Sequence, residues 1–212
     1  MAEKKERKTD RRTVYTRQVI KDSLLELMAS RCFEKISVTA VCAQAEITRA
    51  TFYLHYCDLW DVVNEILAEA LKLAEGMSSP RDNARQVLAQ IVRSDGAPEK
   101  LQEYDSLLPV CQRVAALPKY KVLFLDDGLS SYIVSRIFQT EKETMVPWLM
   151  DYCGICRDEA EMLFRFTIYG AFEVNKAMGW NKDKRWYHIQ STLLRFILSG
   201  TDALAREKHE NQ

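Results

Sequence analysis

The chain is poor in the residues that interrupt helices. Only seven of its 212 residues are glycine and only five are proline. Polar and apolar residues also show no sustained alternation between turn signals, so no β-strand is predicted. Apolar residues instead recur at helical spacing along most of the chain. We therefore expect an all-α fold of about nine helices.

Missing motifs exclude several kinds of chemistry. The sequence has no glycine-rich phosphate loop and no Gly-x-Ser-x-Gly elbow. Its three histidines, His55, His188 and His209, are too scattered to indicate a triad or a metal cluster. Cys153 and Cys156 have a two-residue spacing, but no second Cys or His pair completes a zinc site. We expect neither an enzyme nor a bound metal or other cofactor.

Long apolar runs are missing as well. No segment reaches the roughly 18 consecutive apolar residues that a membrane span needs. No basic start is followed by an apolar run of the kind that marks secretion. The cysteines show no disulfide-framework spacing and are expected to be small core side chains in a reducing compartment; they are Cys32, Cys42, Cys57, Cys111, Cys153 and Cys156. We expect a cytoplasmic protein that does not bind a membrane.

Charge is balanced overall but unevenly distributed. The chain has 30 basic and 30 acidic residues. Residues 1–57 hold 11 Lys or Arg against 7 Asp or Glu, a net charge of +4, and the remainder has a net charge of −4. A basic end on a mildly acidic body suits a protein with one end facing phosphate. Residues 1–15 form a charged tail, for which a solvating role and a phosphate-touching role both stay open.

The most specific pattern lies in residues 37–56, SVTAVCAQAEITRATFYLHY. Ser37 is placed to cap a short helix, whose apolar face carries Val38, Val41, Cys42 and Ala45. After a corner at Glu46 and Ile47, Thr48 is placed to cap a second helix that runs to about His55. Two short helices around a tight corner, the second one rich in polar side chains, are typical of a helix-turn-helix that enters the DNA major groove.

Helices are predicted on both sides of this pair. One runs from about Thr16 to Ser30, and a longer one, capped by Asp58, reaches about Glu75. The composition shift from Gly76 to Pro80 marks a domain boundary, which gives a DNA-binding domain at 16–76 and a helical body at 77–212. The body is predicted to hold helices near 81–94, 98–116, 118–138, 140–153, 157–178 and 183–205, with a possible interruption at 126–128.

Residues 16–66, about a quarter of the chain, resemble the N-terminal DNA-binding domain of TetR-family transcriptional regulators. The resemblance is carried by Arg31-Cys32-Phe33, Ile36-Ser37-Val38, Ala45-Glu46-Ile47-Thr48 and above all Thr51-Phe52-Tyr53-Leu54-His55-Tyr56. The chain departs from the family pattern where Glu46 and Ala50 replace frequent glycines and Leu59 replaces a frequent lysine. At Glu46 a left-handed backbone would cost about 1 kcal/mol.

The resemblance implies a set of DNA contacts. Backbone phosphates are expected to meet Thr39, Thr48, Tyr53 and His55, with Lys35 as a weaker candidate. Base edges are expected to meet Arg49 and Thr51, since arginine grips guanine and the threonine methyl meets thymine. Packing roles for Tyr53 and His55, and simple capping roles for Thr39 and Thr48, remain open.

The family resemblance also implies a homodimer on near-palindromic, double-stranded operator DNA. Its interface is expected on the last two long helices, at Phe166, Tyr169, Phe172, Trp186, Ile189, Leu193, Phe196 and Ile197, although these residues also fit an internal core. The middle helices are expected to enclose a small-molecule effector among Tyr104, Tyr120, Phe124, Tyr132, Trp148 and Tyr152, although aromatic residues at helical spacing fit a plain core too.

The sequence thus favours a dimeric DNA-binding regulator, a repressor that a small molecule releases from its operator. The alternatives are a TetR-like adaptor that binds a protein partner, supported by Glu46 and Leu59, and a thiol sensor that uses Cys111 with the nearby cysteines. An all-helical enzyme is disfavoured, because no constellation of acid, base and nucleophile is present.

Overall fold

The computed structural model describes residues 2–76 and 81–210, and all of its regular structure is helical. The all-α prediction is confirmed for these residues, which contain no strand. They form eleven α-helices and two 3-10 turns, more than the nine helices expected. None of the helices in these two ranges is both long and apolar enough for a membrane span.

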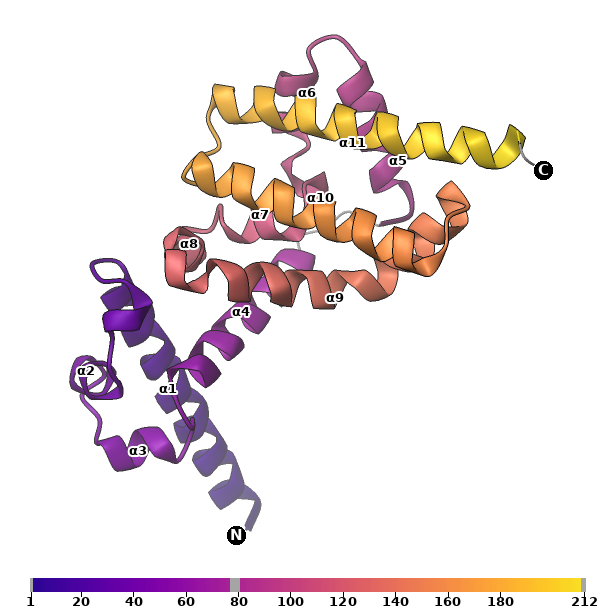
Figure 1. Ribbon diagram of the computed structural model, residues 1–212. Helices are drawn as coiled ribbons and strands as arrows, with labels where there is room; N and C mark the ends of the chain where they lie inside the picture. Colours follow the sequence, from indigo (N-terminus) through magenta and orange to yellow (C-terminus); the bar gives the residue numbers. More distant parts are fainter. Residues whose placement is uncertain (1, 77–80, 211–212) are drawn as a thin grey trace.

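The N-terminal lobe is a small three-helix unit, from which a fourth helix leads into the rest of the chain (Figure 1). Its elements are α1 (Ala2–Met28), η1 (Phe33–Lys35), α2 (Val38–Gln44) and α3 (Arg49–Tyr53), followed by α4 (Leu59–Gly76). Gly76, the first residue of the predicted domain boundary, is therefore the last residue of α4, whereas residues 77–80 lie outside the described residues.

The first helix is longer than the sequence pattern indicated. Residues 2–15, expected as a tail, continue α1 without a break. This stretch contains no glycine or proline and consists mainly of lysine, arginine and glutamate, which are good helix formers.

The body consists of the remaining helices (Figure 1). They are α5 (Arg81–Arg93), α6 (Ala97–Glu103), η2 (Asp105–Leu107), α7 (Val110–Val114), α8 (Pro118–Leu125), α9 (Asp127–Cys153), α10 (Arg157–Ala177) and α11 (Lys184–Glu210). Two predicted boundaries are wrong: the segment 98–116 is divided before Pro109, and α9 passes through Gln139 and includes Pro147.

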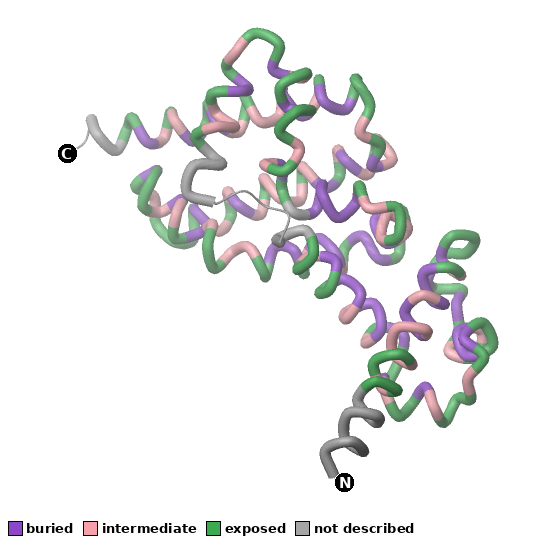
Figure 2. The backbone as a smooth tube through the Cα atoms, turned by 180° about the vertical axis from the view of Figure 1, so that it is seen from behind, coloured by how far each residue is buried: buried purple, intermediate pink, exposed green. Residues whose placement is uncertain are grey.

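Buried apolar side chains form three clusters. Buried residues are purple along the backbone in Figure 2. The first cluster is continuous from the N-terminal lobe into the body, since it holds Phe52 of α3, Ile66 of α4 and Phe124 of α8. The second joins α5 and α6 to α11, and the third joins the end of α9 to the start of α10. Lobe and body therefore share one core.

A buried carboxylate connects the lobe to the body. Asp126 lies between α8 and α9, where its Oδ1 accepts a hydrogen bond from Leu129 N at 3.1 Å and so caps α9. Its Oδ2 accepts from the backbone N–H of Phe33 at 2.7 Å, across 93 residues of sequence. One side chain thus begins a helix of the body and holds the turn that leads to α2.

Side chains around this carboxylate add further contacts between the two parts. The ring of Trp60 lies edge-on between Phe33, at 4.8 Å, and Tyr132 of α9, at 5.0 Å between centroids. The Tyr132 hydroxyl donates to Asn64 of α4. This aromatic row packs η1 against α4 and α9, so the orientation of the lobe is set by side chains from both parts.

We predict that Asp126→Asn lowers the free energy of unfolding by about 1–3 kcal/mol. Asparagine still caps α9 through its remaining oxygen, but its amide N–H₂ would face the Phe33 N–H, so that a buried donor loses its acceptor. Urea denaturation measures the change. Asp183→Asn is the matched control, because Asp183 caps α11 through Trp186 N at 2.7 Å. Equal losses in both variants would contradict a linking role for Asp126.

Candidate nucleic-acid interface

The predicted helix caps at the helix pair are confirmed. Ser37 Oγ accepts from Ala40 N at 3.2 Å at the start of α2, and Thr48 Oγ1 accepts from Thr51 N at 3.1 Å at the start of α3. The corner between them is left-handed at Glu46, with a φ of 52°. This is the position at which the sequence departs from glycine, so the strain anticipated there is present.

Aromatic packing anchors the core-facing side of helix α3. Phe52 is fully buried and lies edge-on to Tyr53, with ring centroids 5.5 Å apart. Tyr56 is buried beyond the helix end, with the Arg17 guanidinium 4.8 Å from its ring centroid. With this side of α3 fixed in the core, the opposite side faces outward.

The outward side carries most of the predicted DNA contacts. Lys35, Thr39, Thr48, Arg49 and Tyr53 are exposed, while Thr51 and His55 are half-buried. The Arg49 guanidinium lies 5.9 Å from the Tyr53 ring centroid, and the hydroxyls of Thr48 and Thr51 are 2.9 Å apart. The α3 residues are thus brought together as pairs, whereas Lys35 and Thr39 come from η1 and the first turn of α2.

Two features of this surface were missed in the sequence. Leu54 is 81% exposed directly after α3, although its position inside the Thr-Phe-Tyr-x-His-Tyr string indicated nothing about exposure. The basic N-terminal part of α1 is helical and projects past α3 in Figure 1. The signal for the second feature was available, because residues 2–15 combine helix-forming composition with positive charge.

Two cations of the lobe, Arg17 and Lys21, are paired with carboxylates of α4. Arg17 donates from Nε to Glu65 Oε1 at 3.2 Å, and the nearly buried Lys21 donates to the same oxygen at 3.1 Å and also pairs with Glu69. Burial acts to raise the pKa of Glu65, but the hydrogen bonds from Arg17 and Lys21 outweigh it and lower that pKa below its usual value. These charges join α1 to α4, whereas Arg49 on α3 and Lys35 on η1 are exposed to solvent.

The six aromatic residues expected to line an effector pocket do not gather around one space. Phe124 is fully buried in the first cluster, Tyr120 is half-buried against the same cluster, and Tyr104 is 46% exposed at the end of α6. Tyr132 belongs to the aromatic row beside Asn64. Trp148 and Tyr152 stack on each other on α9 at 4.7 Å.

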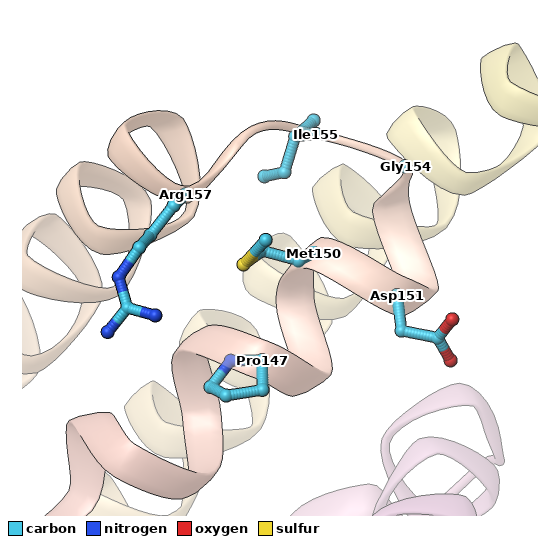
Figure 3. A pocket seen from close by; sticks show the side chains of 6 residues that line it. All are labelled: Pro147, Met150, Asp151, Gly154, Ile155 and Arg157. Atoms are coloured by element: carbon cyan, nitrogen blue, oxygen red, sulfur yellow. The ribbon is translucent and has the colours of Figure 1, made fainter.

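A shallow pocket of about 590 Å³ lies instead at the corner between α9 and α10. Pro147, Met150 and Arg157 face this space in Figure 3, with Asp151 directed away from them and Gly154 and Ile155 on the connecting loop. None of the six aromatic residues lines it.

The residues expected at a dimer interface divide into two groups. Phe166 and Phe196 are 67% and 68% exposed, and Tyr169, Ile189, Leu193 and Ile197 are half-buried. Phe172 and Trp186 are buried inside the chain, which corrects their assignment to an exterior face. Their helical positions point toward Phe124 and Asn175 respectively.

The six cysteines fall into a buried group and an exposed group. Cys42, Cys111 and Cys153 are buried, as expected of core side chains, but Cys32, Cys57 and Cys156 are exposed. Burial raises the pKa of the Cys111 thiol to about 12, so this thiol is protonated at neutral pH. Within the described residues, no group of three or more His, Cys, Asp or Glu side chains is placed to hold a metal ion.

Neither a scan against models of protein families nor a search of curated proteins gives a match for this chain. The motif in residues 31–56 and the geometry of α2 and α3 are therefore what supports a functional proposal.

We predict that Glu46→Gly stabilises the protein by up to about 1 kcal/mol, because glycine adopts the left-handed backbone at this corner without steric cost. Thermal and urea unfolding of the purified variant measure the change. Ala43→Gly, on the exposed side of α2, is the control and should destabilise by about 1 kcal/mol. A loss of stability in both variants would mean that the corner is not strained.

Proposed function

We propose that this chain is a TetR-like transcriptional regulator that binds operator DNA as a homodimer and is released by a small molecule. The observation that carries the proposal is the outward side of α3. There the exposed Arg49 is held over Tyr53, beside the paired hydroxyls of Thr48 and Thr51, on a helix anchored by Phe52.

This arrangement suits a duplex for physical reasons. A helix anchored on one side keeps its position when its other side enters a groove, and arginine can donate two hydrogen bonds to guanine. Holding Arg49 against Tyr53 before binding reduces the side-chain entropy that binding would otherwise cost. Lys35 and Thr39, at the start of the helix pair, then serve as phosphate contacts that set the register.

We propose that a second copy of the chain binds the face formed by α10 and α11. These two helices are joined to each other by hydrogen bonds that Trp186 and Gln190 of α11 donate to Asn175 of α10. On α10 the exposed Met162 and Phe166 precede Gly170 at four-residue spacing, so they lie on one side of the helix. On α11 the exposed Phe196 and Gly200 have the same spacing.

The glycines on this face favour close approach by another helix. An added Cβ at Gly170 or Gly200 would meet no atom within 4 Å, which means that both open onto space outside the chain. Large apolar side chains beside such openings are typical of a surface that another copy covers. Two-fold symmetry would then present two α3 helices to a palindrome at roughly 34–36 Å or a multiple of it.

We predict that selection from random double-stranded DNA enriches a short palindrome, and that Arg49→Ala weakens binding to it by roughly 1–3 kcal/mol and relaxes the preference at one base position per half-site. Fluorescence anisotropy at fixed salt measures the affinity. Arg136→Ala, an exposed arginine on α9, is the control and should bind normally. If no sequence is enriched by the wild-type protein, the proposed function is wrong.

We predict further that the double variant Phe166→Glu/Phe196→Glu is a folded monomer with greatly weakened operator binding, because charges would be buried in the interface without partners. Sedimentation equilibrium gives the mass and circular dichroism verifies folding. Tyr104→Glu is the control, since Tyr104 is exposed directly after α6, which packs on the buried side of α11. A dimeric double variant would place the interface elsewhere.

A further inference from the structure

Helix α7 packs against α4 and is unusually polar for a buried element. Its sequence is VCQRV, and Cys111, Gln112, Arg113 and Val114 are all less than a tenth exposed. A helix that served packing alone would be expected to bury apolar side chains here, since a buried amide or guanidinium is costly unless it is hydrogen-bonded.

Gln112 is one end of a chain of side-chain hydrogen bonds that connects α7, α11 and α10. Its Nε2 donates to Gln190 Oε1 at 3.0 Å, and Gln190 Nε2 donates to Asn175 Oδ1 at 3.3 Å. The same Asn175 oxygen accepts from the indole Nε1 of Trp186 at 2.8 Å, and Asn175 Nδ2 donates to Ala171 O at 2.7 Å. Gln190, Asn175 and Trp186 are almost completely buried.

The indole determines the direction of every bond in this chain. An indole N–H can only donate, so the Asn175 oxygen must face it. Gln190 must then present its N–H₂ group to that oxygen, which turns its own oxygen toward Gln112. Gln112 must in turn donate. The orientation of all three amides therefore follows from the one group that has no alternative.

The chain ends in an acceptor. Gln112 Oε1 is buried and has no hydrogen-bond partner among the described residues. Such an orphan is rare in native proteins, because burial deprives the oxygen of water without replacing it. Reversal of the Gln112 amide cannot remove the orphan, since it would direct an oxygen at the oxygen of Gln190.

We propose that Gln112 Oε1 is the anchor of a ligand subsite on α7, and that it takes a neutral, largely apolar small molecule bearing an N–H or O–H donor. An ionised carboxylate has no proton to offer this oxygen. A cation would approach the buried guanidinium of Arg113, the next residue on the helix. Cys111 and Val114 on α7 belong to the first apolar cluster, and Trp186 belongs to the second.

For the effect of such a ligand, the inference rests on the proposed function. Val114 and Ala115 belong to the same apolar cluster as Ile66, Leu67 and Ala70, all on α4. A ligand that displaces α7 would therefore act on the helix that leads into the DNA-binding lobe. The differential affinity of the ligand for the two arrangements would set how far the equilibrium shifts.

The test uses matched pairs of probes that differ only in the donor. Isothermal titration calorimetry of the full-length protein compares indole with 1-methylindole, and phenol with anisole. We expect the donor-bearing member of at least one pair to bind roughly tenfold more tightly, since its partner leaves the buried acceptor unpaired. Binding of none of the four, or equal binding within both pairs, would overturn the proposal and indicate that Gln112 meets a buried water.

Variants identify the oxygen responsible. Gln112→Met removes the acceptor at similar side-chain length and should abolish the preference within the pair, whereas Gln102→Met, at an exposed position on α6, should retain it. Trp186→Phe should reduce the preference as well, because without the indole the amides are free to reverse. If Gln112→Met still prefers the donor-bearing probe, the ligand's N–H or O–H donates to an acceptor other than Gln112 Oε1.

The wild-type comparison stands even if a variant fails to fold. Calorimetry also requires no DNA, so a protein that binds indole but selects no operator would retain this site and lose the proposed function. A protein that selects an operator but binds none of the four probes would support the proposed function and rule out the ligand subsite.

Discussion

The buried carboxylate of Asp126 is the constraint on which the relation between the two parts of the molecule depends. It starts α9 and holds the Phe33 N–H at the same time. This double role requires the first turn of α9 to come close to η1, and the approach is visible at Gly128. A Cβ there would lie 3.2 Å from Glu34 Oε1, tighter than side chains normally allow. Because η1 leads directly into α2, this contact acts together with the aromatic row of Phe33, Trp60 and Tyr132 to place the helix pair.

Features that depend on neighbouring residues could be predicted from the sequence. Ser37 and Thr48 each accept a hydrogen bond from an amide only three residues away, so a short stretch of sequence is enough to predict both caps. The left-handed corner at Glu46 is a similar case, since the tight connection between two helices requires it regardless of the residue present. The outward position of Arg49 follows in turn from the helix that Thr48 starts and Phe52 anchors.

Features that depend on distant partners could not be predicted in this way. Helical spacing indicates that Phe124, Tyr132 and Trp148 have a buried side, but it does not identify the helix that each meets. In the fold, Phe124 and Tyr132 pack in the first cluster and Trp148 packs against the third. The bond from Asp126 to Phe33 spans 93 residues of sequence, so the string Asp126-Asp127-Gly128 indicates only an interruption of the helix. The hydrogen-bonded side chains that begin at Gln112 could not be predicted from the sequence either, because they come from three helices.

The strengths of these contacts determine how a signal could travel in the proposed regulator. The ion pair of Lys119 and Asp22 also joins body to lobe, at 2.7 Å, but both side chains are more than two-fifths exposed and such pairs contribute about 0–1 kcal/mol. The Asp126 bond and the apolar cluster shared by α3, α4, α7 and α8 are buried, so they carry most of the coupling. A packed core of this kind moves as discrete units and does not deform gradually. Movement of α7 would therefore reach α3 as a rotation of the whole lobe, and the spacing between two recognition helices is what such a rotation changes.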